Sequence, residues 1–97
     1  MRPGGIPRIH SWEDVKTHEL KCWPQYWNEI AVGRKTVEVR HNDRGFKVGD
    51  TLVLREWDPR VRAYTGARLT AAVREVHDLA PIGVLDHVAM RIGAVRQ

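Results

Sequence analysis

Three side chains that could together bind an anion or a nucleobase lie close together in one alternating segment of the chain. These are Lys35, Glu38 and Arg40, and alternation of apolar and polar residues is typical of a strand. Val37 and Val39 are expected to face a core, which places Glu38 and Arg40 on the opposite, polar face. Lys35 and Arg40 could then hold a phosphate while Glu38 accepts a hydrogen bond from a base or ribose hydroxyl. The same side chains could instead form ion pairs on a solvated strand face.

Other catalytic or cofactor-binding patterns are missing from the sequence. No glycine-rich loop joins a predicted strand to a predicted helix, as a phosphate-binding loop would require. The only serine is Ser11, so there is no serine nucleophile elbow. The five histidines lack the short spacings of metal ligands, and the single cysteine, Cys22, allows no disulfide within a monomer. We therefore expect neither a metal nor a cofactor.

The elements that must position these side chains follow from the apolar periodicity and the turn residues. A proline- and glycine-rich arm, residues 1–16, precedes a single domain over residues 17–97. Alternation predicts five strands and a helix-type stripe predicts one amphipathic helix. The strands are expected at 17–23, 35–41, 51–57, 67–77 and 87–93, the helix at 24–32, and the longer loops at 59–66 and 78–86. Short strands with one buried face favour a small, mostly β member of the α+β class, a barrel with one packed helix.

Parity within each element predicts which side chains form the core. The helix is expected to pack on the barrel through its stripe of tryptophans, and Cys22 is expected to be buried filler rather than a nucleophile. The inward-facing residues are His18, Leu20 and Cys22; Trp23, Trp27, Ile30 and Ala31; Val37 and Val39; Leu69, Ala71 and Val73; and Val88, Met90 and Ile92.

Trp57 and Tyr64 stand on either side of the predicted loop 59–66. Aromatic rings at the border of a loop can stack on a nucleobase, so both are candidate ligand-binding residues. His18 has inward parity and could be a satisfied interior group, but it also remains a secondary candidate for the site.

Composition and charge favour a polyanionic partner. The chain has 97 residues, of which 16 are basic and 12 acidic, for a net charge of +4. Arginine outnumbers lysine, and its planar fork suits phosphate and base edges, although a GC-rich genome gives the same bias. No apolar run is long enough to span a bilayer, and the N-terminus lacks the apolar stretch of a signal peptide. We expect a cytoplasmic protein that does not contact a membrane.

A longer motif surrounds the three charged residues and gives the sequence a family resemblance. The motif residues are His18, Leu20, Lys21, Trp23, Pro24 and Trp27; Gly33, Lys35, Thr36, Glu38 and Arg40; Asn42, Asp43, Arg44, Phe46, Val48, Gly49 and Asp50; and Leu54, Glu56, Trp57, Tyr64, Thr65 and Gly66. In these residues the chain resembles the ASCH domains of the PUA-like superfamily, and in particular a subgroup of short bacterial and phage proteins, over residues 17–93.

The resemblance implies a β-barrel with a basic cleft, between barrel and helix, that receives RNA or a nucleotide. Lys35, Glu38 and Arg40 would line this cleft, with Lys21 and Arg44 nearby. His18, Trp57 and Tyr64 complete the candidate ligand-binding set. A barrel that binds another protein is the alternative if the charged residues are locked in ion pairs.

Enzymatic activity is a further implication of the resemblance. Some ASCH proteins are small amidohydrolases that deacetylate N4-acetylcytidine with a Lys, a Thr and a Glu. The Lys of that set falls on Lys35, but the Thr falls on Glu38, so the hydroxyl nucleophile is missing. A different hydrolysis, with Glu38 as general base and Lys35 steadying an oxyanion, remains chemically open.

Overall fold

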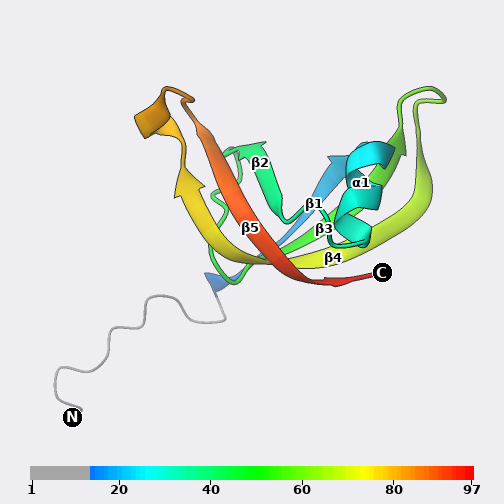
Figure 1. Ribbon diagram of the computed structural model, residues 1–97, viewed down its shortest axis with the longest axis horizontal. Helices are drawn as coiled ribbons and strands as arrows, with labels where there is room; N and C mark the ends of the chain where they lie inside the picture. Colours follow the sequence, from blue (N-terminus) through cyan, green and yellow to red (C-terminus); the bar gives the residue numbers. More distant parts are fainter. Residues whose placement is uncertain (1–13) are drawn as a thin grey trace, which may run out of the picture.

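The computed structural model describes residues 14–97, which fold into five strands and one α-helix in the predicted order (Figure 1). The expected N-terminal arm, residues 1–16, lies outside the described residues except for its last three. The mostly β fold class is confirmed. The elements are β1 (Thr17–Cys22), α1 (Pro24–Ala31), β2 (Val37–His41), β3 (Thr51–Asp58), β4 (Ala63–Asp78), the 3-10 turn η2 (Ala80–Ile82) and β5 (His87–Arg96).

The strands form one sheet that curls into a half-barrel. Their order is β1-β3-β4-β5-β2, and every pairing is antiparallel except the parallel pairing of β1 with β3. The 16-residue β4 pairs with β3 along one half and with β5 along the other, so it curves beneath the whole molecule (Figure 1). The sheet ends at β1 on one side and at β2 on the other, and helix α1 covers part of the concave face.

The core fills this concave side, and the predicted inward parity is confirmed for β1, β4 and β5. Helix α1 packs on the core through Trp27 and Ile30. Trp27 also donates from its indole Nε1 to the carbonyl oxygen of Leu54 at 3.0 Å, which satisfies the polar end of a buried ring. The apolar core consists of Leu20, Cys22, Trp27, Ile30, Phe46, Leu52, Leu54, Leu69, Ala71, Val73, Val88, Met90 and Ile92.

The predicted faces of β2 are reversed in the structure. Val37 and Val39 are 43% and 54% exposed, whereas Glu38 is 4% exposed. The cause is the register with β5, where Glu38 stands opposite Met90, a fully buried residue. Directly paired residues point to the same side of an antiparallel sheet, so Glu38 must follow Met90 inward.

Two further expectations are wrong. Trp23 is 47% exposed rather than packed in the core, because it is the N-cap residue and precedes the first turn of α1. The predicted loop 59–66 is shorter, since β3 continues to Asp58 and β4 already begins at Ala63. A bulge opposite Glu56 breaks the alternation there, beyond which Trp57 pairs with Tyr64 and extends the hairpin.

A buried carboxylate fixes the chain where it enters β3. Asp50 is 1% exposed and accepts from the backbone N–H groups of Lys16 and Lys47, at 2.9 and 3.0 Å, and from Nε2 of His18 at 2.8 Å. Burial acts to raise the pKa of Asp50, but the hydrogen bonds from His18 and the two amides outweigh it and hold that pKa below its usual value. His18 is therefore a satisfied interior group.

Candidate functional site

Side chains rather than backbone hydrogen bonds join the two edges of the half-barrel. Arg40, on β2, donates from Nη2 to the carbonyl oxygen of Lys21 on β1 at 3.0 Å. Arg44, just beyond β2, donates from Nη1 to the carbonyl oxygen of Glu19 at 2.9 Å. Backbone carbonyl groups on the free edge of a sheet lack hydrogen-bond donors from a neighbouring strand, and these two guanidinium groups supply donors to β1 instead. The two edges therefore form a seam that side chains can line.

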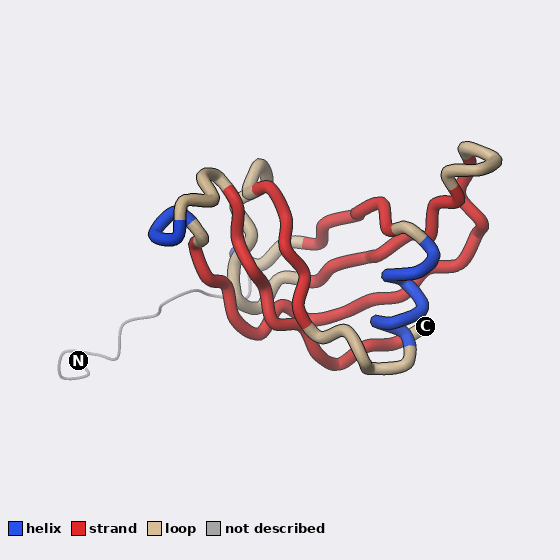
Figure 2. Tube along the Cα trace, turned by 45° about the horizontal axis from the view of Figure 1, so that its top comes forward, coloured by secondary structure: helices blue, strands red, loops and turns tan. Residues whose placement is uncertain are grey.

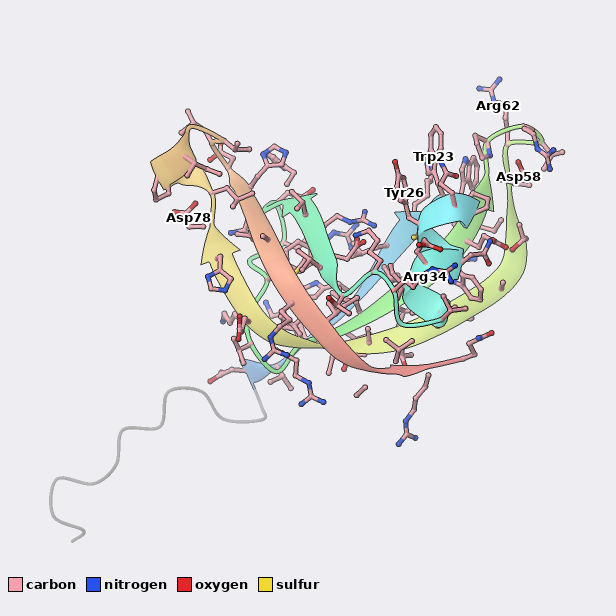
Figure 3. All side chains as sticks on the ribbon, in the orientation of Figure 1. Trp23, Tyr26, Arg34, Asp58, Arg62 and Asp78 are labelled. Atoms are coloured by element: carbon pink, nitrogen blue, oxygen red, sulfur yellow. The ribbon has the colours of Figure 1, made fainter. Side chains whose placement is uncertain are left out.

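A cavity of about 400 Å³ opens at this seam, beside the start of α1. Three cationic side chains and one carboxylate share its wall, with two aromatic rings at the mouth. Figure 3 shows Trp23 and Tyr26 projecting side by side from the first turn of the helix, and they are 47% and 51% exposed. The lining residues are Lys21, Cys22, Trp23, Tyr26, Lys35, Glu38, Val39 and Arg40.

Glu38 holds the charged part of the cavity together. Its Oε1 accepts from Nζ of Lys35 at 2.9 Å, and its Oε2 accepts from Nε of Arg40 at 2.9 Å. The Lys35 ammonium also donates to the carbonyl oxygen of Val37. Within the described residues, the Arg40 guanidinium uses two of its five N–H groups and the Lys35 ammonium two of its three. Both cations therefore keep donors for a ligand, in positions fixed by a buried carboxylate.

The end of helix α1 places Lys35 at the cavity. Gly33 adopts φ +83°, a left-handed conformation that glycine takes without strain. The chain then turns back so that the amides of Arg34 and Lys35 both donate to the carbonyl oxygen of Glu29, at 2.9 and 3.0 Å. Lys35 is thereby anchored to the helix on one side and begins the approach to β2 on the other.

Cys22 lines the cavity but is not an activated nucleophile. The residue is 3% exposed, and its Sγ lies 3.8 Å from the carbonyl oxygen of Trp23. Burial, reinforced by the nearby Glu38 carboxylate, raises the pKa of the Cys22 thiol to about 11. The thiol is protonated at neutral pH, whereas a reactive cysteine needs a thiolate.

The structure brings four of the predicted site residues together and separates the other four. Lys21, Lys35, Glu38 and Arg40 line the cavity. Arg44 lies in the seam and contacts β1 instead, and His18 is engaged by Asp50 in the interior. Trp57 and Tyr64 lie outside the cavity on the β3–β4 hairpin.

Sequence reasoning missed the aromatic mouth of the cavity. Tyr26 is not among the predicted ligand-binding residues, and the apolar stripe of the helix predicts a core position for Trp23. A signal was available in Pro24, because a proline at the first helical position makes the preceding residue the N-cap and removes it from the packed stripe. Trp23 and Tyr26 then lie on the same side of the first turn.

Residues 14–97 contain no candidate metal centre and no candidate membrane-spanning helix. This part of the chain holds no group of three or more His, Cys, Asp or Glu side chains that could bind a metal ion. No helix within it is long and apolar enough to cross a membrane.

Comparison with known proteins identifies the family. The chain is 38% identical over 66 residues to an uncharacterized 12.9 kDa protein in the GpA 3' region of Escherichia phage P2, a match that covers 68% of this chain and 59% of the phage protein. Residues 17–90 match the family described as a domain of unknown function, DUF3850. This match includes every residue that lines the cavity at the seam. The chain therefore belongs to the DUF3850 family.

Proposed function

We propose that this protein is an ASCH-type module of the PUA-like superfamily that binds RNA or a nucleotide in the cavity at the seam. One observation carries the proposal: a buried carboxylate, Glu38, orients Lys35 and Arg40 in an open cavity while both cations keep free donors. A solvated ion pair would not need a buried carboxylate between two cations. Trp23 and Tyr26 at the mouth add aromatic surface of the kind on which a base stacks.

Each part of the cavity has a separate task in this proposal. The remaining N–H groups of Arg40 and Lys35 contact phosphate oxygens, for which guanidinium and ammonium groups are well suited. Each oxygen of Glu38 accepts one hydrogen bond from the protein. A carboxylate oxygen can accept more than one, so Glu38 can also receive an exocyclic amine or a ribose hydroxyl. Lys21 supplies a third cation at the edge of the cavity.

Calorimetric titration with uridine and cytidine monophosphates and with a short RNA tests this proposal. The wild-type protein is expected to bind, and Arg40→Ala is expected to lose most of that binding. Arg91→Ala is the matched control, because Arg91 pairs with Glu75 at 3.0 Å and does not line the cavity. Arg40→Gln, which is shorter and uncharged but still carries a hydrogen-bond donor, checks the result if Arg40→Ala unfolds. Wild-type affinity in both Arg40 variants, or no binding by the wild-type protein, would overturn the proposal.

A second candidate function is hydrolysis of a modified nucleoside. The contact of 2.9 Å between Lys35 Nζ and Glu38 Oε1 favours it, because a cation beside a carboxylate can steady an oxyanion while the carboxylate takes a proton. Against it, both Glu38 oxygens are already held by cations. We expect turnover of N4-acetylcytidine to be weak or absent, as followed by chromatography of released cytidine. Robust deacetylation that Lys35→Ala abolishes would make hydrolysis the primary function.

A further inference from the structure

Cations and aromatic rings alternate over the β3–β4 hairpin and the adjoining end of β1, beside the cavity. Lys21 Nζ lies 3.9 Å from the ring centroid of Trp57, and the guanidinium carbon of Arg55 lies 3.9 Å from that of Tyr64. The two rings meet edge to face, with centroids 4.9 Å apart. We call Lys21, Arg55, Trp57 and Tyr64, together with Arg68, the arm surface. The β3–β4 hairpin, which carries all of the arm surface except Lys21, reaches well past helix α1 (Figure 2).

The cations of the arm surface are only loosely neutralised. Glu19 lies 3.6 Å from Nη1 of Arg55 and 3.8 Å from Nη2 of Arg68, both longer than a good hydrogen bond, and its side chain is 57% exposed. Within the described residues, Lys21 has no carboxylate close enough to form an ion pair. A hollow of about 140 Å³ lies between Arg55, Tyr64 and Arg68. The positive charge here is available to an incoming anion.

The arm surface is continuous with the cavity through one residue. Lys21 lines the cavity and also covers the ring of Trp57. Tyr64 leaves 40% of its surface in solvent, so a flat ligand can stack on it without disturbing the core. A sugar–phosphate backbone leaving the cavity over Lys21 would meet both aromatic rings and arginines, which is the combination that proteins use to bind single-stranded nucleic acid.

We propose that the ligand is a single-stranded oligonucleotide: one nucleotide occupies the cavity and a neighbouring one stacks on Tyr64, beside Trp57, its phosphate held by Lys21 and Arg55. This inference rests on the proposed function and adds a second subsite to it. A duplex is disfavoured, because its bases are already stacked and paired and offer no free face to Tyr64. An acidic peptide could match the charge but would leave the aromatic rings without a stacking partner.

The experiment compares ligands of increasing length on wild-type and variant proteins. Uridine monophosphate and uridine oligonucleotides of two, four and eight residues are titrated by calorimetry or fluorescence anisotropy. Affinity is expected to rise sharply between the mononucleotide and the tetranucleotide. Stacking contributes about 5-fold to 100-fold per base, so Tyr64→Ala should lower tetranucleotide affinity by about that factor. The variant should leave mononucleotide affinity unchanged, and Tyr64→Phe should retain the wild-type pattern because it keeps the ring.

The outcomes separate the two proposals. If neither mononucleotide nor oligonucleotide binds, the proposed function itself fails. If the mononucleotide binds but affinity does not rise with length, or Tyr64→Ala binds the tetranucleotide like the wild-type protein, only the second subsite is overturned. Tighter binding of a duplex, or full competition by polyglutamate, would also overturn the inference. Trp57→Leu provides a second aromatic variant, with thermal melting to confirm that each protein is folded.

Discussion

Replacing Glu38 by Gln tests whether burial makes its carboxylate indispensable. The side chain is 5% exposed, and each of its oxygens accepts one charge-assisted hydrogen bond, from Lys35 and Arg40. A glutamine of the same size has one acceptor oxygen and one NH₂ group. Whichever way the amide turns, one cation faces a donor. Lys35 and Arg40 also lose the charge that lets them lie close together.

The magnitude follows from the hydrogen bonds and from how far the cations can reach water. A hydrogen bond to a charged group contributes about 1.5–3 kcal/mol. The side chains of Lys35 and Arg40 are 28% and 26% exposed, so each can partly turn to solvent and recover some of the loss. We therefore expect Glu38→Gln to lower the free energy of unfolding by about 1–2 kcal/mol. In a domain of this size the melting temperature then falls by about 5–15 °C.

Glu75 provides a matched control for this measurement. It also accepts from two side chains, those of His77 and Arg91, each at 3.0 Å, but its own side chain is 48% exposed. Glu75→Gln is expected to leave the melting temperature unchanged within error, because exposed ion pairs add little stability. Thermal and urea unfolding, followed by circular dichroism, measure both variants. Equal effects in the two variants, or no effect in Glu38→Gln, would refute the argument from burial.

Three further expectations follow from the same structure. Asp50→Asn should destabilise the protein at neutral pH and make its stability depend less on pH in acid. The pKa of Asp50 in the folded protein lies below its usual value of 3.8, so the carboxylate stabilises the fold fully above that pH, and this stabilisation is lost as the pH falls through the lower, folded pKa. A loss of stability in acid as steep as that of the wild-type protein would contradict this. Cys22 should react slowly with a thiol reagent at pH 8 and rapidly in urea, since its thiol is buried and its pKa is near 11; fast labelling of the native protein would show that the cavity wall opens. Affinity for single-stranded RNA should fall with salt, with a log–log slope of about −0.7 per phosphate contacted; binding that is insensitive to salt would argue against phosphate contacts by Lys21, Lys35 and Arg40.

The sequence alone determined the number and order of the strands and the place of the α-helix. Strict alternation in 17–22, 69–73 and 88–92 predicts strands whose apolar parity is the core side, and the structure buries those residues. Pro24 and Gly33 predict both ends of the helix, because each has a strong positional preference at a helix terminus. The grouping of Lys35, Glu38 and Arg40 was also readable, since they are near neighbours along the chain.

Tertiary structure decided which way that group faces. Alternation gives a period of two but no direction, and in β2 the two valines suggested the wrong face. The direction comes from the pairing of Glu38 with Met90, a residue of β5, which is the last strand of the chain. Burial of the Glu38 carboxylate is tolerated because Lys35 and Arg40 compensate its charge. Arg40 is itself held in place by its hydrogen bond to the carbonyl oxygen of Lys21 on β1. The cavity lies between β1 and β2, which follow each other in the sequence but stand at opposite ends of the sheet because β1 pairs with β3 and β2 pairs with β5. No local pattern records these pairings.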